Sequence, residues 1–153
     1  MWPFLLAFIG MDFYIDAMPE LPEVETVMRG MEKVLRGAQI ATVEQFRPDL
    51  RVPFPPKLKE TLEGQSVTAL ERRAKYIIVH FNAAPSFILH LGMSGRVLLV
   101  PPTQDYALQK HDHLILTTAT GDRVVYNDVR RFGMVYLANK AGWQAHNAFR
   151  DMG

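Results

Sequence analysis

The 153-residue sequence contains no cysteine. This absence excludes disulfide bonds within the chain and any zinc site built from thiolate ligands. A strong charge of either sign is also missing, because 17 Lys and Arg are set against 16 Asp and Glu. A formal net charge of +1 does not by itself predict a nucleic-acid partner, so the clustering of cations matters more than their sum.

Long hydrophobic runs are lacking as well. The apolar run from Trp2 to Ile9 spans eight residues, whereas a helix needs about 20 to cross a bilayer. No Lys or Arg precedes the run, as a secretory signal would require. We therefore interpret residues 1–17 as an amino-terminal extension, upstream sequence made coding by an early start assignment, with Met18 as the working start. A genuine terminal strand and a membrane-touching segment are the alternatives.

The remaining sequence has enough apolar residues for one domain with a real core, since 48% of the chain is hydrophobic. Its first element is a predicted helix over Pro22–Arg36, in which apolar residues recur at helical spacing. Glu23 and Glu25 in the first turn suit the helix dipole, and Gly37 suits a C-cap. Lys57–Leu62 is predicted to form a second, short helix.

From Ser66 onward the pattern changes to short apolar or alternating runs separated by Gly, Pro, Asn and Asp. Such runs predict strands, and Thr120-Gly121-Asp122 is predicted to form a hairpin turn. Many short strands with turn signals favour an antiparallel sandwich or barrel. The predicted strands are Val67–Leu70, Tyr76–Phe81, Phe87–Leu91, Val97–Val100, Leu114–Thr118, Arg123–Tyr126 and Met134–Leu137.

Four motifs follow one another along the chain. The first three are MPELPEVET at 18–26, RRAKY at 72–76 and HLGMSG at 90–95. The fourth has two parts, KHDH at 110–113 and NDVRRFG at 127–133. In order and approximate spacing they resemble the formamidopyrimidine-DNA glycosylases, over residues 18–153. The sequence departs from that pattern at Val129, where the family usually has proline, in its leading extension, and in stopping after Gly153.

The resemblance implies a fold and a domain assignment. Residues 18–153 are expected to form the catalytic amino-terminal domain, an α+β, mainly β fold: an antiparallel β-sandwich flanked by an amino-terminal helix and a second short helix. The family continues with a helix–two-turns–helix module and a four-cysteine zinc finger, for which no sequence remains here. No cofactor or metal is therefore expected in this chain.

The resemblance also implies catalytic roles for Pro19, Glu20, Glu23 and Lys75. In the family the proline becomes the nucleophile through its free secondary amine once the initiator Met is removed. Glu20 would protonate the sugar ring oxygen and shuttle protons, Glu23 would help place the damaged nucleotide, and Lys75 would contact the phosphate beside the lesion. Inside a longer chain the nitrogen of Pro19 is an amide and cannot attack. Ordinary helix-start acidity is the alternative for the glutamates.

The resemblance also implies a set of DNA-binding residues. His90 and His111 would contact the DNA backbone, and Arg130 would hydrogen-bond the orphaned base. Met93 and Phe132 would fill the space left by the flipped nucleotide. The alternatives are packed histidines and core positions for Met93 and Phe132. A solvated face is the alternative for Arg72 and Arg73. His111 and His113 around Asp112 are only a weak pattern for a metal site.

The function expected from the resemblance is DNA repair. The enzyme would be a base-excision glycosylase with abasic-site lyase activity that removes oxidised purines (oxoguanine, formamidopyrimidine) from duplex DNA through a Schiff base on Pro19. Leu21 favours this branch, because relatives acting on oxidised pyrimidines usually have glycine there. We expect a monomer that acts in the bacterial cytoplasm without contacting a membrane. The alternatives are a catalytically inactive DNA-binding fragment and a fragment that folds but binds little.

Overall fold

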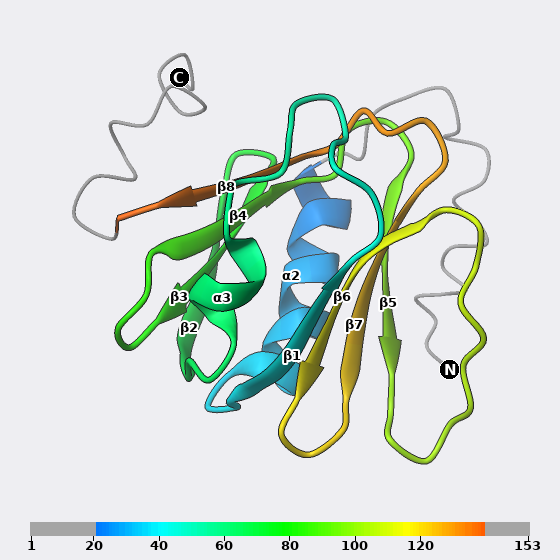
Figure 1. The fold of residues 1–153 in the computed structure, drawn as a ribbon. Helices are drawn as coiled ribbons and strands as arrows, with labels where there is room; N and C mark the ends of the chain where they lie inside the picture. Colours follow the sequence, from blue (N-terminus) through cyan, green and yellow to red (C-terminus); the bar gives the residue numbers. More distant parts are fainter. Residues whose placement is uncertain (1–20, 140–153) are drawn as a thin grey trace.

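The computed structural model describes residues 21–139, and they form a sandwich of two antiparallel sheets with two helices (Figure 1). Pro19, Glu20 and the extension 1–17 lie outside the described residues, as does the stretch from 140 onward. None of the described helices is long and apolar enough to cross a membrane.

Each sheet has four strands. The first has the order β1-β6-β7-β5 and the second the order β2-β3-β4-β8. The bounds of the first are β1 Ile40–Gln45, β6 Asp112–Thr118, β7 Arg123–Asp128 and β5 Gly95–Val100. The bounds of the second are β2 Val67–Arg73, β3 Tyr76–Phe81, β4 Ser86–His90 and β8 Met134–Ala138.

The core lies between the inner faces of the two sheets. Alternate residues of the central strands enter it, such as Ile77 and Val79 of β3 and Leu114 and Leu116 of β6. This alternation is the period of two that places successive side chains on opposite faces of a strand. The intervening residues of β3 and β4 are also buried and form a small cluster of their own around Ile78 and Ile88.

The helix α2 (Leu21–Leu35) packs its apolar stripe against β2, β3 and β5. Its residues Val24, Met28, Met31 and Leu35 are buried in the main core. The short helix α3 (Leu58–Leu62) packs on β1 through its buried leucines. Figure 1 shows α2 in blue running between the two sheets, with its first turn at the upper end of the molecule.

The predicted fold class is confirmed, including the amino-terminal helix and the second short helix. All seven predicted strands are present, with ends that differ by up to three residues. The hairpin turn between β6 and β7 is confirmed too, and Gly121 takes a φ of 93° there, a backbone region that favours glycine.

The strand β1 was missed. Its buried residues Ile40 and Val43 are three apart instead of two or four. The register against β6 shifts between Ile40 and Thr42, which is a β-bulge or a similar irregularity. Such a shift puts one extra residue in the strand and interrupts the alternation that predicts strands from sequence.

Candidate nucleic-acid interface

The predicted site residues gather at one end of the sandwich because strand register brings their turns together. His90 pairs with Tyr76 on one side and with Met134 on the other, so the β2–β3 turn and the start of β8 flank the end of β4. In the other sheet Gly95 pairs with Asp128. This end is at the top of Figure 1, next to the first turn of α2.

The β2–β3 turn carries Lys75. Ala74 takes a φ of 53°, which makes the chain reverse tightly between the two strands. Arg72 supports the turn by donating from a terminal guanidinium nitrogen to the Ala74 carbonyl at 3.0 Å. Lys75 is half-buried beside this support and forms no ion pair with any residue between 21 and 139. A half-buried cation of this kind is suited to a phosphate.

Arg72 also connects this turn to α2. Its Nε atom donates to the Glu25 carboxylate at 2.6 Å, and Arg29 pairs with the same carboxylate at 2.9 Å. The hydrogen bond from Arg72 is the main reason that the pKa of Glu25 is below its usual range, and Arg29 lowers that pKa further. The solvated-face interpretation is therefore wrong for Arg72. The helix that would follow Pro19 and Glu20 is tied to the turn of Lys75.

Glu23 lies in the first turn of α2 and is half-buried there. It is on the same helix as Glu25 and at the same end of the molecule as Lys75. Its role toward a nucleotide stays a prediction.

His90 is buried at the end of β4, with 8% of its surface exposed. Its Nδ1 atom accepts from the Gly92 amide at 3.0 Å, and its ring meets the ring of Tyr76 edge-on at 4.8 Å. Burial lowers the pKa of His90, and the cations Lys75 and Arg51 lower it further. A neutral imidazole that accepts at Nδ1 carries its proton on Nε2. His90 is thus packed at the end of β4, and its contact with the DNA backbone stays a prediction.

Two loops carry the predicted wedge residues. Met93 lies half-buried in the turn between β4 and β5. Arg130 and Phe132 lie in the loop between β7 and β8, with the guanidinium carbon of Arg130 5.0 Å from the ring centre of Phe132. The side chain of Phe132 is exposed at 40%, so its interpretation as a core residue is wrong.

The two loops touch each other at Gly92. A Cβ placed on Gly92 would lie 2.5 Å from the carbonyl carbon of Phe132 and 2.7 Å from the Gly133 nitrogen. Real Cβ atoms essentially never approach other atoms so closely, so only glycine allows this contact. The φ of Gly92 is 66°, which also favours glycine. The turn of Met93 and the loop of Phe132 therefore form one continuous surface.

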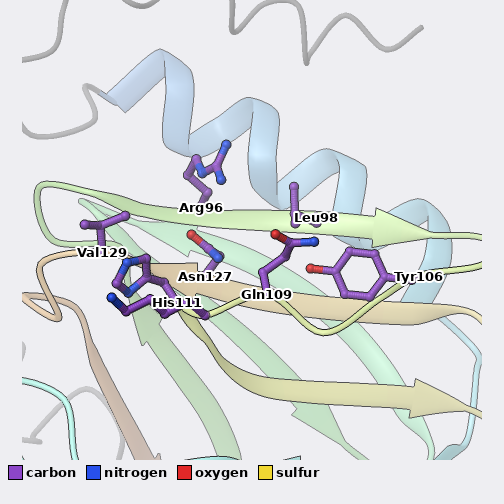
Figure 2. Close-up of a pocket in the computed structure, with 8 residues that line it drawn as sticks. Arg96, Leu98, Tyr106, Gln109, His111, Asn127 and Val129 are labelled. Atoms are coloured by element: carbon purple, nitrogen blue, oxygen red, sulfur yellow. The ribbon is translucent and has the colours of Figure 1, made fainter.

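His111 precedes β6 on the outer side of the other sheet, where it lines an open pocket of about 340 Å³ (Figure 2). Arg96, Lys110 and Val129 line the same pocket, so two further cations lie beside His111. Asp112 does not offer a metal site, because its carboxylate accepts from Tyr106, the Gln109 amide and Asn127. Within residues 21–139 no group of three or more His, Asp or Glu side chains is placed to hold a metal ion.

Sequence reasoning missed two cations and one carboxylate at this end. Arg51 reaches it from the loop after β1, where its amide donates to the Gly133 carbonyl at 3.4 Å and its charge affects His90. Arg96 stands on β5 beside His111. Asp128 is fully buried beneath the wedge loops. Of these three residues only Asp128 lies within a motif of the sequence, NDVRRFG, and that motif gave no role for its carboxylate.

Comparison with known proteins gives this arrangement its context. The family model described as the formamidopyrimidine-DNA glycosylase N-terminal domain matches residues 18–135. The chain belongs to this family. A formamidopyrimidine-DNA glycosylase of Methylocella silvestris is 47% identical over 145 residues, and one of Paracoccus denitrificans is 51% identical over 126 residues. These alignments cover 89% and 78% of this chain but only 50% and 45% of the relatives. The chain therefore spans about half the length of these glycosylases.

Solved glycosylase structures share the fold. MutM in complex with DNA containing carbocyclic 8-oxo-G superimposes with a TM-score of 0.74 at 35% identity, covering 83% of this chain and 46% of that one. The Lactococcus lactis Fpg bound to abasic-site DNA gives a TM-score of 0.72 at 36% identity, covering 80% and 45%. Both of those structures hold DNA, with carbocyclic 8-oxo-G in one and an abasic site in the other.

Proposed function

We propose that this chain provides the amino-terminal, lesion-facing part of a DNA glycosylase that removes oxidised purines and cleaves the resulting abasic site. The observation that carries the proposal is the Arg72 bridge, which ties α2 to the turn of Lys75 at the end of the sandwich where the wedge loops meet. The resemblance of the whole motif set to damage-binding glycosylases supplies the reaction type.

The proposed chemistry needs Pro19 at the amino terminus. Its secondary amine attacks C1′ of the damaged nucleoside, the bond from C1′ to the base breaks, and the base leaves with the proton that the amine loses. Glu20 then protonates the sugar ring oxygen, the bond from C1′ to that oxygen breaks, and the lone pair of the proline nitrogen forms an iminium. The resulting iminium acidifies the C2′ proton, whose removal expels the 3′ phosphate and cuts the strand. Covalent catalysis of this kind divides one difficult step into easier ones. Lys75 would hold the phosphate during base removal and strand cleavage. The proposed reaction requires no cofactor.

The surface charge fits a DNA partner. Lys75, Arg51 and Arg130 lie around the wedge loops, whereas the nearby acid Asp128 is fully buried. Three cations thus lie together around the wedge loops although the net charge of the chain is only +1, and the clustering of cations matters more than their sum. The matched relatives are bacterial, which supports our proposal that this activity acts on DNA in the bacterial cytoplasm.

Borohydride trapping on abasic-site DNA tests the proposal. The form that starts at Pro19 should give a covalent complex, and the form that starts at Met1 should give none, since the nitrogen of Pro19 is then an amide and cannot attack. Equal trapping by both forms would show that another amine, such as Lys75, is the nucleophile. If neither form is trapped yet both bind DNA, the chain is a non-catalytic DNA-binding fragment.

Binding supplies a second readout. We expect the chain to bind duplex DNA weakly and with little lesion preference, because it spans about half of its relatives. Lys75→Gln should reduce the slope of log affinity against log salt by about one, as loss of one phosphate contact predicts. Lys33→Gln, on the exposed last turn of α2, is the matched control and should leave the slope unchanged. Tight, salt-insensitive, lesion-selective binding would contradict this expectation.

A further inference from the structure

Asp128 is a buried carboxylate that the chemistry proposed above does not use. It stands at the end of β7 with none of its surface exposed. It forms no ion pair with any residue of the described stretch 21–139. Burying a carboxylate without a cationic partner is costly unless hydrogen bonds satisfy its oxygens. The question is which parts of the molecule provide those bonds.

Four donors satisfy the two oxygens. Oδ1 accepts from the Ser94 hydroxyl at 2.5 Å and from the Arg131 amide at 3.0 Å. Oδ2 accepts from the Tyr126 hydroxyl at 2.5 Å and from the Gly133 amide at 2.9 Å. Three of the four donors thus come from the two loops that carry Met93, Arg130 and Phe132, and only Tyr126 belongs to a strand.

Ser94 extends the link, because its Oγ atom accepts from the Arg130 amide at 3.0 Å while it donates to Asp128. The turn of Met93 is therefore joined to the neighbouring loop at both Arg130 and Arg131. Arg131 has a φ of 57°, a backbone conformation that L side chains rarely adopt. A loop that holds such a residue needs external support, and Asp128 bonds to its amide.

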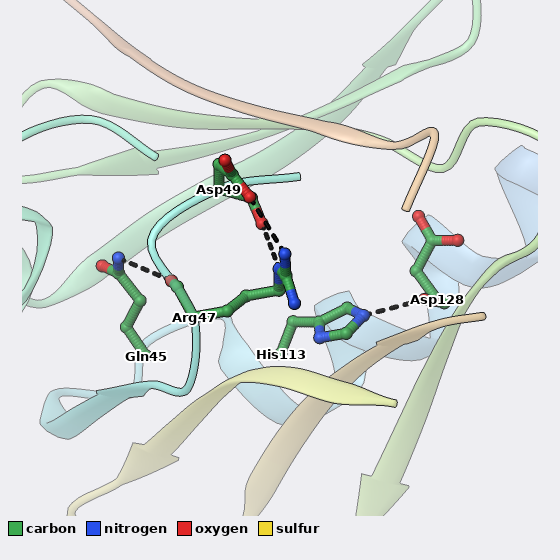
Figure 3. A network of polar contacts seen from close by, with 5 residues as sticks. All are labelled: Gln45, Arg47, Asp49, His113 and Asp128. Carbon is green, nitrogen blue, oxygen red and sulfur yellow. Dashed lines mark hydrogen bonds and ion pairs between the residues drawn. The ribbon is translucent and has the colours of Figure 1, made fainter. Parts of the chain in front are cut away.

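The backbone of Asp128 is itself held in place. Its carbonyl accepts from Nε2 of His113 at 2.8 Å, and its amide donates to the His111 carbonyl at 3.0 Å. Figure 3 shows the ring of His113 on the neighbouring strand pointing at that carbonyl, while the carboxylate of Asp128 extends away from it. The backbone of Asp128 is thus fixed to the sheet, and its carboxylate points toward the Met93 turn and the Arg130–Phe132 loop.

We propose that Asp128 is a positioning residue that holds the Met93 turn and the Arg130–Phe132 loop as one unit, so that these side chains enter a DNA duplex in a fixed arrangement. The inference rests on the proposed function for its DNA step but not for the coupling of the loops. Each of the two loops crosses from one sheet to the other, from β4 to β5 and from β7 to β8, and three of the four bonds join them to this one carboxylate.

The test compares two variants that each delete one hydroxyl bond to the same carboxylate. Ser94→Ala removes the hydroxyl that joins the Met93 turn to Asp128, and with it the acceptor of the Arg130 amide in the other loop. Ser94 is only partly buried, so the fold should survive. Tyr126→Phe removes a bond of the same length, but its donor lies within β7. Thermal melting of both variants records their general loss of stability.

The first arm measures amide hydrogen exchange in the full free chain. Ser94→Ala should accelerate exchange at Arg131 and Gly133 on the order of tenfold, as expected for losing a hydrogen bond to a charged acceptor. The amides of β3 should not change. In Tyr126→Phe the same loop amides should change less than about threefold. The proposal is overturned if Ser94→Ala exchanges like the parent, or if Tyr126→Phe loosens the loops equally.

The second arm uses a duplex with 2-aminopurine opposite an abasic site, whose fluorescence reports unstacking by the wedge. Ser94→Ala should lower the fluorescence change at saturating protein, while its Kd stays within about twofold of the parent, because phosphate contacts position a protein on DNA independently of base contacts. An unchanged amplitude would overturn the DNA step. If the parent chain itself gives no fluorescence change, the proposed function fails, and the exchange arm still decides whether Asp128 couples the loops.

Discussion

Gly92→Ala is the substitution that tests the contact between the two wedge loops. Two costs add at this position. The φ of 66° places an alanine in the left-handed region, which costs an L residue about 1–2 kcal/mol. The new Cβ would also lie 2.5 to 2.7 Å from backbone atoms of Phe132 and Gly133, which cannot rotate away as a side chain does. Overpacking of this kind typically costs about 1–3 kcal/mol more.

Gly37→Ala is the matched control. Gly37 has a comparable φ of 80°, but no atom lies within 4 Å of a Cβ placed there. It should therefore lose only the left-handed cost of about 1–2 kcal/mol. Any stabilisation from the reduced freedom of the unfolded chain is the same for both substitutions and cancels in the comparison. The expected difference between the variants is thus about 1–3 kcal/mol, which isolates the loop–loop contact.

Urea denaturation at one pH, followed by tyrosine fluorescence, measures both free energies of unfolding. The m-values should stay equal, since the surface exposed on unfolding is unchanged. Equal losses in the two variants would refute the reasoning, because they would show that the Met93 turn and the Phe132 loop do not contact each other as described. A loss at Gly37 larger than at Gly92 would refute it as well.

Two further predictions concern pH. The pKa of His90 is lowered from its ordinary 6.5, so the unfolded chain binds the proton first as pH falls. The free energy of unfolding should therefore decrease as pH drops below about 6.5. In His90→Gln this part of the pH dependence should be lost between pH 7.5 and 5.5, and identical slopes in the two proteins would contradict the assignment. Glu25 has a lowered pKa, so its bridge stabilises above the ordinary 4.5 and is lost as pH falls through the native value. Arg72→Met should cost about 1 kcal/mol or less at pH 7, since both side chains are partly exposed, and less at a pH below the native pKa of Glu25, where only the bond to the Ala74 carbonyl is lost. An equal cost at both pH values would exclude the bridge.

Local sequence patterns were sufficient for most of the secondary structure. The apolar stripe of α2 and the alternating runs of the central strands are local properties, because one face of each element must be buried. The turn at Gly121 follows from a backbone conformation that glycine adopts without strain. The motifs at 72–76, 90–95 and 127–133 also located the turns that meet at the site. All of these signals depend on residues close together in the chain.

The strand β1 was not predictable in this way, because its register shift removes the alternation on which recognition depends. The pairing of the strands into two sheets also required the structure, since nothing in a single strand specifies which neighbour it takes. That pairing places His90 between Tyr76 and Met134 and so assembles the site.

By itself the sequence determined the class of fold, the helix after residue 20 and the set of residues that deserved attention. Only the tertiary structure showed which contacts hold those residues in place. Arg72 was one cation in a charged run until it was seen to bind Glu25, 47 residues away. Asp128 was one acid in a motif until its oxygens were seen to accept from Ser94, 34 residues earlier. Hydrogen bonds act over a few ångströms in space whatever the separation along the chain, so contacts of this kind leave no periodic signal in a sequence.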